Sequence, residues 1–215
     1  MRIVVFGASG RIGSVIVREA LSRGHRVTAA VRSPQKVQTS HPHLEVIKAR
    51  IDEVPSVVAA VSGHDAVVHA VGGLGHENPS ISIDCMEPLT KGMMDAGVDR
   101  LFVVGTAGTL EVPAGGLRLN QPDFPEHLKV EAQAHSEVLA FLRATTTRRL
   151  RWTYFSPPAV IVPGKRTGRV KLGRDQLLFD EEGQSYISNE DYAAVAVDEL
   201  ESPKHIGLRF TAIAV

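Results

Sequence analysis

Short apolar runs alternate with longer amphipathic stretches along most of the 215 residues. Residues 3–6 form a continuous, largely β-branched run, which is typical of a strand buried on both faces. Between Ile12 and Leu21 the apolar residues recur at helical spacing, and Gly24 follows as a stop. The same alternation predicts further strands at 25–31, 44–48, 65–71, 100–104 and 151–155, and helices at 54–61, 88–96 and about 125–143.

Regular alternation of strands and helices predicts an α/β fold with a doubly wound parallel sheet. We expect the first strand to be central and the carboxyl ends of the strands to form the ligand-binding edge. The length suits a single domain. We expect residues 1–155 to form its dinucleotide-binding core and residues 156–215 a small substrate-side region.

The last 50 or so residues contain weaker signals. Residues 167–172 and 176–179 are predicted to pair as a hairpin, and residues 180–183 to form a turn. Ser188 precedes two acidic residues, a pattern typical of a capped helix start, and residues 192–200 are amphipathic. A final strand is expected at 208–215.

The sequence GASGRIG joins the first strand to the first helix, and its three glycines suit a dinucleotide-binding turn of the Rossmann type. Gly7 permits a tight turn, Gly10 allows the backbone to approach a pyrophosphate, and Gly13 brings helix and strand together. The free N–H groups of the helix start then face the phosphates. The predicted binding residues of this turn are Gly7, Ala8, Ser9, Gly10, Arg11, Ile12 and Gly13.

A basic residue stands at the end of the second predicted strand, where an NAD-binding protein commonly has an acidic one. Arg32 suits a 2′-phosphate through charge-assisted hydrogen bonds, and Arg11 and Lys36 add positive charge nearby. The sequence therefore predicts NADP(H) in preference to NAD(H). An ordinary solvated arginine is the alternative.

Further candidates follow the fourth, fifth and sixth strands. Ala70, Val71 and Gly72 are small enough for a cofactor to approach, and Pro157 is expected beside the cofactor. The polar candidates for catalysis near the reacting ring are Thr106, Thr109 and Lys129. Thr106 is also a candidate for cofactor binding. Each also has a plain alternative: the threonines bond their own turn, and the lysine is solvated.

Composition narrows the classes of function. The chain carries 24 basic and 24 acidic residues, with no basic block for nucleic acid and no apolar stretch that would span a membrane. A single cysteine, Cys85, excludes an internal disulfide, and the nine histidines lack metal-site spacing. We expect a cytoplasmic protein without a metal; whether it is a monomer or a dimer stays open.

Five segments of the chain resemble the atypical short-chain dehydrogenases. They are VRSP, VVGTAGTLEV, PDFPEHLKVEA, WTYFSPPAVIVPGKRTGRVKLGRDQLL and SYISNEDYAAVAVDELESPKHIGLRFT. The likeness covers essentially the whole chain. The group that these segments resemble is that of the NADH-flavin reductases, within the NmrA-like proteins and near biliverdin reductase B. The resemblance implies nicotinamide binding and reduction of a flavin or quinone. The Tyr-x-x-x-Lys pair of standard members is absent, since Pro158, Glu190 and Ala196 follow the three tyrosines at that spacing.

Two functions remain open from the sequence. In the first, the protein passes hydride from NADPH to a small conjugated acceptor of the flavin or quinone type, which accepts its proton from water. In the second, it is a non-catalytic sensor that reports the NADP(H) state to a partner, and loss of the tyrosine–lysine pair favours this reading. An epimerase is a weaker third choice, because such members usually keep that pair.

Overall fold

The computed structural model describes residues 1–72, 78–145 and 149–215. Eight strands form one sheet in the order β3-β2-β1-β4-β5-β6-β10-β8, and two more form a small separate pair, β7-β9. The strands are β1 (Arg2–Phe6), β2 (Arg26–Val31), β3 (Leu44–Lys48), β4 (Ala66–His69), β5 (Arg100–Val104), β6 (Arg151–Ser156), β7 (Val160–Val162), β8 (Val170–Gly173), β9 (Tyr186–Ser188) and β10 (Leu208–Ala214).

Six α-helices and four short 3₁₀ turns lie within these described residues. The α-helices are α1 (Arg11–Ser22), α2 (Val54–Val61), α3 (Ile81–Asp84), α4 (Met86–Asp95), α5 (Lys129–Ala144) and α6 (Asn189–Glu201). The 3₁₀ turns are η1 (Pro34–Lys36), η2 (Ala107–Thr109), η3 (Arg118–Asn120) and η4 (Glu126–Leu128). No helix in the described part of the chain has the length and apolar character needed to cross a membrane.

The predicted doubly wound sheet is confirmed. Strand β1 lies inside the sheet, parallel to β2 on one side and to β4 on the other. Its residues Ile3 to Phe6 are buried, as a strand covered on both faces requires. All strands from β3 to β6 in the sheet order run parallel, so their carboxyl ends share one edge. The GASGRIG turn leaves β1 at that edge.

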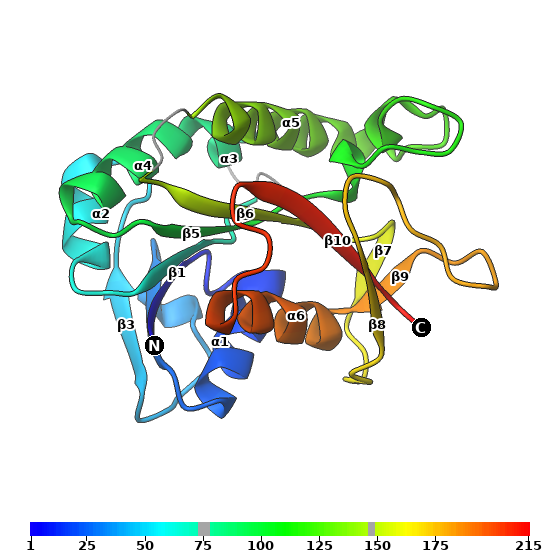
Figure 1. Ribbon diagram of the computed structural model, residues 1–215. Helices are drawn as coiled ribbons and strands as arrows, with labels where there is room; N and C mark the ends of the chain where they lie inside the picture. Colours follow the sequence, from blue (N-terminus) through cyan, green and yellow to red (C-terminus); the bar gives the residue numbers. More distant parts are fainter. Residues whose placement is uncertain (73–77, 146–148) are drawn as a thin grey trace.

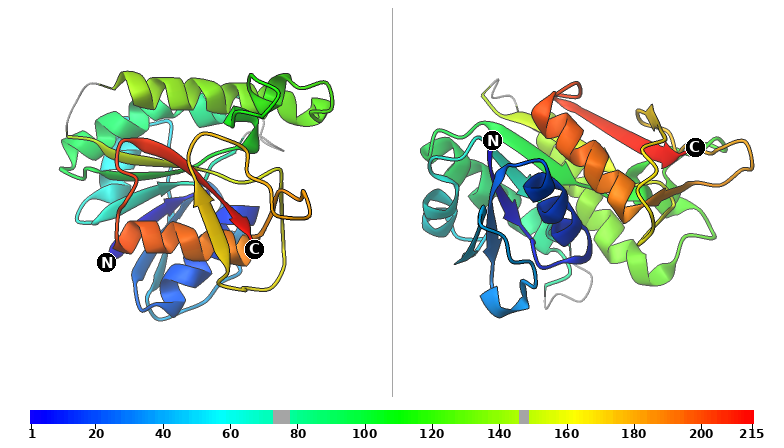
Figure 2. Two further views of the ribbon diagram at one scale, coloured as in Figure 1. Left: turned by 45° about the vertical axis from the view of Figure 1, so that its right-hand side comes forward. Right: turned by 90° about the horizontal axis from the view of Figure 1, so that it is seen from below.

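Helices cover both faces of the sheet (Figure 1). Helices α1 and α6 lie side by side on one face, and the two views of Figure 2 show them adjacent. Helices α2, α4 and α5 pack on the other face with α3 beside them. The two larger hydrophobic cores follow this division: Ile16 and Val197 belong to the first, Val57, Leu89 and Val138 to the second.

The predicted start of α6 is confirmed. The Ser188 side chain accepts a hydrogen bond of 2.9 Å from the Asp191 backbone N–H, and Glu190 and Asp191 occupy the first turn. The Asp191 carboxylate also accepts hydrogen bonds from the backbone N–H groups of Thr167 and Gly168, at 2.9 and 2.8 Å. This helix start therefore holds the long loop between β7 and β8 in place.

The predicted hairpin between 167–172 and 176–179 is wrong. Strand β8 pairs antiparallel with the last strand, β10, instead. The following segment turns toward the loop after β5, where Leu177 N–H donates to the Glu111 carbonyl at 2.8 Å. Strand β8 pairs with the edge of β10, which lies far along the chain, and the local sequence does not indicate this pairing. Helix 125–143 is also shorter than predicted, because its first turn is η4.

Candidate functional site

Two of the three glycines build the turn itself. Gly7 has φ +81°, and a Cβ there would overlap the Ala70 carbonyl, lying 2.6 Å from its carbon. A Cβ at Gly13 would overlap the Gly7 carbonyl, lying 2.8 Å from its carbon. Both positions therefore need glycine for the fold, whether or not a ligand binds.

Gly10 has a different role. Its φ of −80° suits any residue, and a Cβ there would meet only the Gly7 carbonyl oxygen, at 3.1 Å. Gly10 is exposed and caps α1 without a side chain. The first turn of α1, which the structure describes throughout, holds no acidic residue. Its free N–H groups and the positive end of the helix dipole thus face open space, as an anion site requires.

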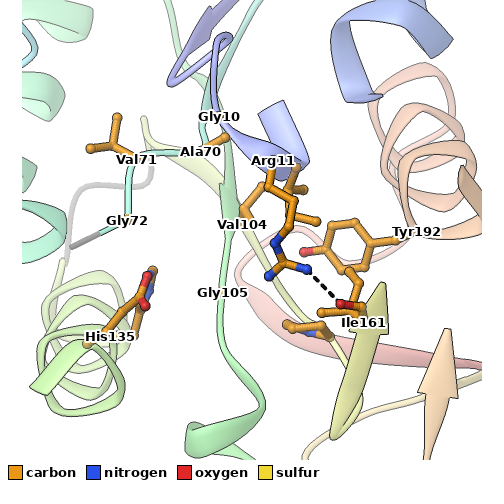
Figure 3. A pocket seen from close by; sticks show the side chains of 13 residues that line it. Gly10, Arg11, Ala70, Val71, Gly72, Val104, Gly105, His135, Ile161 and Tyr192 are labelled. Carbon is orange, nitrogen blue, oxygen red and sulfur yellow. Dashed lines mark hydrogen bonds between the residues drawn. The ribbon is translucent and has the colours of Figure 1, made fainter. Parts of the chain in front are cut away.

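A cavity of about 280 Å³ opens beside this helix start (Figure 3). It lies at the carboxyl edge of β1, β4 and β5, with α5 on one side and the C-terminal region on the other. Its lining residues are Gly10, Arg11, Ile12, Ala70, Val71, Gly72, Val104, Gly105, Glu131, His135, Pro157, Ile161 and Tyr192.

Arg11 crosses the mouth of the cavity. Its Nη1 donates a hydrogen bond of 2.6 Å to the Ile161 carbonyl in β7, as the dashed line in Figure 3 marks. The guanidinium therefore joins the glycine turn to the C-terminal region. The Arg11 side chain is exposed, and its guanidinium supplies positive charge beside the start of α1.

Helix α5 contributes Glu131 and His135 to the opposite wall, one helical turn apart. Glu131 reaches Gly72, where an added Cβ would overlap its carboxylate, 3.6 Å from the Cδ. His135 is 3% exposed, and its Nδ1 lies 3.3 Å from the Tyr154 hydroxyl. Burial lowers the pKa of His135 to about 3, with the nearby His69 adding to the effect, so the ring is neutral at physiological pH.

Two buried tyrosines, Tyr154 and Tyr192, pack around the cavity. The Tyr154 ring lies directly against Gly105, where a Cβ would sit only 2.9 Å from the ring Cδ1. Tyr192 comes from α6, and its hydroxyl donates to the Phe155 carbonyl at 2.7 Å. The Tyr192 ring stacks on Phe155 at 4.0 Å between centroids. These buried rings make the wall rigid and leave Gly105 no room for a side chain.

Comparison with known proteins assigns this arrangement to a family. The model of a family described as NAD(P)H-binding matches residues 7–203. The chain belongs to the NAD(P)H-binding family. Its resemblance to the atypical short-chain dehydrogenases is thereby confirmed. The YwnB protein of Bacillus subtilis (strain 168) is 38% identical over 100% of this chain and 99% of its own.

Two solved structures extend this family likeness to the fold. A proposed epimerase from Bacteroides thetaiotaomicron is 39% identical, with a TM-score of 0.90 over 100% of this chain and 97% of its own. A proposed NADH-flavin reductase from Streptococcus pneumoniae TIGR4 is 35% identical, with a TM-score of 0.81 over 100% of both chains. The chain is an oxidoreductase-type member of the NAD(P)H-binding family.

The cavity fits the nicotinamide cofactor of the NAD(P)H-binding family. The uncapped start of α1, the side-chain-free surface at Gly10 and the positive charge of Arg11 together suit a pyrophosphate. The predicted residues that line the cavity are Gly10, Arg11, Ile12, Ala70, Val71, Gly72 and Pro157. Gly7, Ala8, Ser9 and Gly13 lie in the turn beneath it and shape its backbone.

The structure places the predicted catalytic residues elsewhere. Thr106 accepts a hydrogen bond from Gly108 N–H at 3.3 Å, and Thr109 is buried and donates to the Thr106 carbonyl at 3.0 Å. Both hydroxyls thus serve the η2 turn. Lys129 Nζ pairs with Glu126 at 2.6 Å. None of these three belongs to the described lining of the cavity, and their catalytic role stays a prediction.

Arg32 lies at the end of β2, beside the turn in the sheet order but outside the cavity lining. Its side chain is exposed. Asp52 lies near enough to feel its charge: the neighbouring Arg50 holds the pKa of Asp52 below its usual value, and Arg32 contributes. Arg32 therefore lies at the end of β2 with an acidic group nearby, and its contact with a 2′-phosphate stays a prediction.

Several lining residues are absent from the sequence prediction. Glu131, His135 and Tyr192 lie on helices that the sequence predicts, whereas Ile161 lies on β7, a strand that it does not predict. The i, i+4 spacing of Glu131 and His135 was the available signal, since such residues share one helix face. Nothing in the sequence said which face of that helix turns toward the ligand edge.

Proposed function

We propose that the protein is an NAD(P)H-dependent reductase that passes hydride to a planar conjugated acceptor such as a flavin or a quinone. One observation carries this: a cavity runs from the uncapped start of α1 to a buried, rigid wall of α5 and α6 side chains. When bound there, the cofactor supplies the hydride. The protein's residues hold the cofactor and orient the acceptor.

The C-terminal region supports this division of roles. Pro157, Ile161 and Tyr192 all come from residues 156–215, and this region lines the side of the cavity opposite α5 (Figure 3). We assign the dinucleotide to residues 1–155 and the acceptor to this second region. The tyrosines lie on β6, β9 and α6, so none occupies α5 where the Tyr-x-x-x-Lys pair of standard members lies. Acceptors that take their proton from water suit such a site.

NADP(H) is the proposed cofactor in preference to NAD(H), because Arg32 offers a guanidinium at the end of β2. The acceptor is a small molecule, and the proposed compartment is the cytoplasm. The S. pneumoniae relative, as a proposed NADH-flavin reductase, supports the same class of acceptor.

Turnover distinguishes this proposal from a redox sensor. NADPH is titrated into the protein by calorimetry, and its oxidation is then followed without oxygen against flavin mononucleotide and a set of quinones. If the protein is a reductase, it binds NADPH and reduces at least one acceptor at a rate that saturates with acceptor concentration. A protein that binds NADPH tightly but oxidises it with none of these acceptors is a sensor instead.

A further inference from the structure

His135 is a buried polar residue in the cavity wall that α5 forms, opposite the C-terminal region to which we assign the acceptor. It comes from α5 and lies across the cavity from Gly10 and Arg11 (Figure 3). The residue is 3% exposed, and the Tyr154 hydroxyl lies 3.3 Å from Nδ1. Tyr154 itself is 0% exposed and is held against Gly105. The ring of His135 therefore has a fixed neighbour on one nitrogen and the cavity beside it.

The hydrogen-bond partner of Nδ1 decides what Nε2 presents. A phenol O–H is a stronger donor than the N–H of a neutral imidazole, so the favourable arrangement has Tyr154 donating to Nδ1. The single imidazole proton then sits on Nε2. The opposite arrangement, with Nδ1 donating and the Tyr154 hydroxyl turned to the His135 carbonyl at 3.4 Å, leaves Nε2 as an acceptor. The two arrangements differ in whether Nε2 is a hydrogen-bond donor or an acceptor.

We propose that neutral His135, oriented by Tyr154, donates a hydrogen bond from Nε2–H to the acceptor atom that gains negative charge as hydride arrives. This assignment rests on the proposed function. His135 keeps its proton throughout: the acceptor gains the hydride pair, the Nε2–H bond stabilises the resulting anion, and water then supplies the proton. A fixed donor of this kind acts because it needs no reorganisation during the reaction.

The surroundings keep the ring neutral. Glu131 shares its helix face, His69 approaches from β4, Tyr154 from β6, Tyr192 lies on α6, and Arg11 stands across the cavity. Burial is the largest influence on the pKa of His135, and it disfavours the imidazolium. His135 is therefore a hydrogen-bond donor and not a general acid, and the rate should show no histidine titration.

Nuclear magnetic resonance of protein labelled with ¹⁵N-histidine tests the tautomer without any turnover. We expect the proton of His135 on Nε2 and no titration between about pH 5 and pH 8. Tyr154→Phe should shift the ring toward a mixture of tautomers. A wild-type ring protonated on Nδ1, or one that titrates near neutral pH, overturns the proposal.

Kinetics test the same residue during turnover. His135→Leu should lower kcat about a hundredfold, the usual effect of removing such a donor, with little change in NADPH affinity by calorimetry. His135→Gln keeps an N–H donor and should lose less. His127→Leu, at an exposed histidine just before α5, is the matched control and should match the wild type.

The possible failures are distinct. Wild-type activity with unchanged kcat in His135→Leu overturns the role of His135 and leaves the reductase intact. A wild type that binds NADPH and reduces no acceptor overturns the proposed function, and the role of His135 falls with it.

Discussion

Gly10→Ala should separate cofactor binding from folding. Gly10 has φ −80°, which alanine adopts freely, and the added Cβ would meet one atom, the Gly7 carbonyl oxygen, at 3.1 Å. Alanine reduces the entropy of the unfolded chain, which stabilises by about 0.4–1 kcal/mol, but it is a poorer helix cap by a similar amount. The free energy of unfolding should therefore change by less than about 1 kcal/mol.

The effect on binding should be much larger. The new methyl group would stand in the cavity between the α1 N–H groups and the pyrophosphate. Loss of one charge-assisted hydrogen bond costs roughly 1.5–3 kcal/mol, which weakens NADPH binding about 10- to 100-fold. Calorimetric titration with NADPH measures the affinity, and urea unfolding without cofactor measures the stability.

Gly13→Ala is the matched control. Its Cβ would overlap the Gly7 carbonyl, so this variant should lose stability as well as binding. Unchanged NADPH affinity in a stable Gly10→Ala protein would refute the argument that the backbone meets the phosphates at this glycine.

Three further perturbations test other parts of the account. Arg32→Ala should remove most of an expected 10- to 100-fold preference for NADPH over NADH, because the lost charge-assisted bond is worth about 1.5–3 kcal/mol. The NADH affinity should stay constant. Equal affinities of the wild type for both cofactors by titration would make Arg32 a plain surface residue. Gly105→Ala should cost about 1–3 kcal/mol in urea unfolding, because its Cβ would press on the buried Tyr154 ring, and an unchanged midpoint would mean that the ring moves freely. Burial alone would raise the pKa of Asp191, yet hydrogen bonds from Gly168 and Thr167 hold this pKa below the usual 3.8. The ionised carboxylate therefore contributes to the free energy of unfolding above that pH, and the contribution is lost as the pH falls through and below it. Asp191→Asn should therefore reduce stability by about 2 kcal/mol near neutral pH and by much less in acid, and an equal loss at every pH would contradict the assignment.

The fold could be predicted from the sequence because its central strands are buried on both faces. Ile3 to Phe6 and the strands beside them read as apolar runs that no surface element would carry. The glycine turn could be predicted for a related reason, since backbone geometry requires glycine at Gly7 and Gly13. The pairing of β8 depended on β10, about 40 residues away, and no local pattern encodes that choice.

The chemistry of the cavity wall was harder to predict. Thr106 and Thr109 follow a strand at the ligand edge, but their hydroxyls satisfy the backbone of their own turn. Lys129 and His135 lie on one helix, and only the packing of α5 decides that His135 is buried while Lys129 faces Glu126. Side-chain direction on a helix depends on tertiary contacts, and these became visible only in the structure.

Hydride transfer from NADPH within the cavity beside α1 should show a kinetic isotope effect. In a single turnover without oxygen, the protein is mixed with a saturating acceptor and with NADPH carrying deuterium at the transferred position of the nicotinamide. We expect oxidation that saturates with NADPH and is slower for the deuterated cofactor. Below saturation, both rates should be greatly reduced in Gly10→Ala. Tight NADPH binding with no oxidation by any flavin or quinone would contradict the proposed hydride transfer.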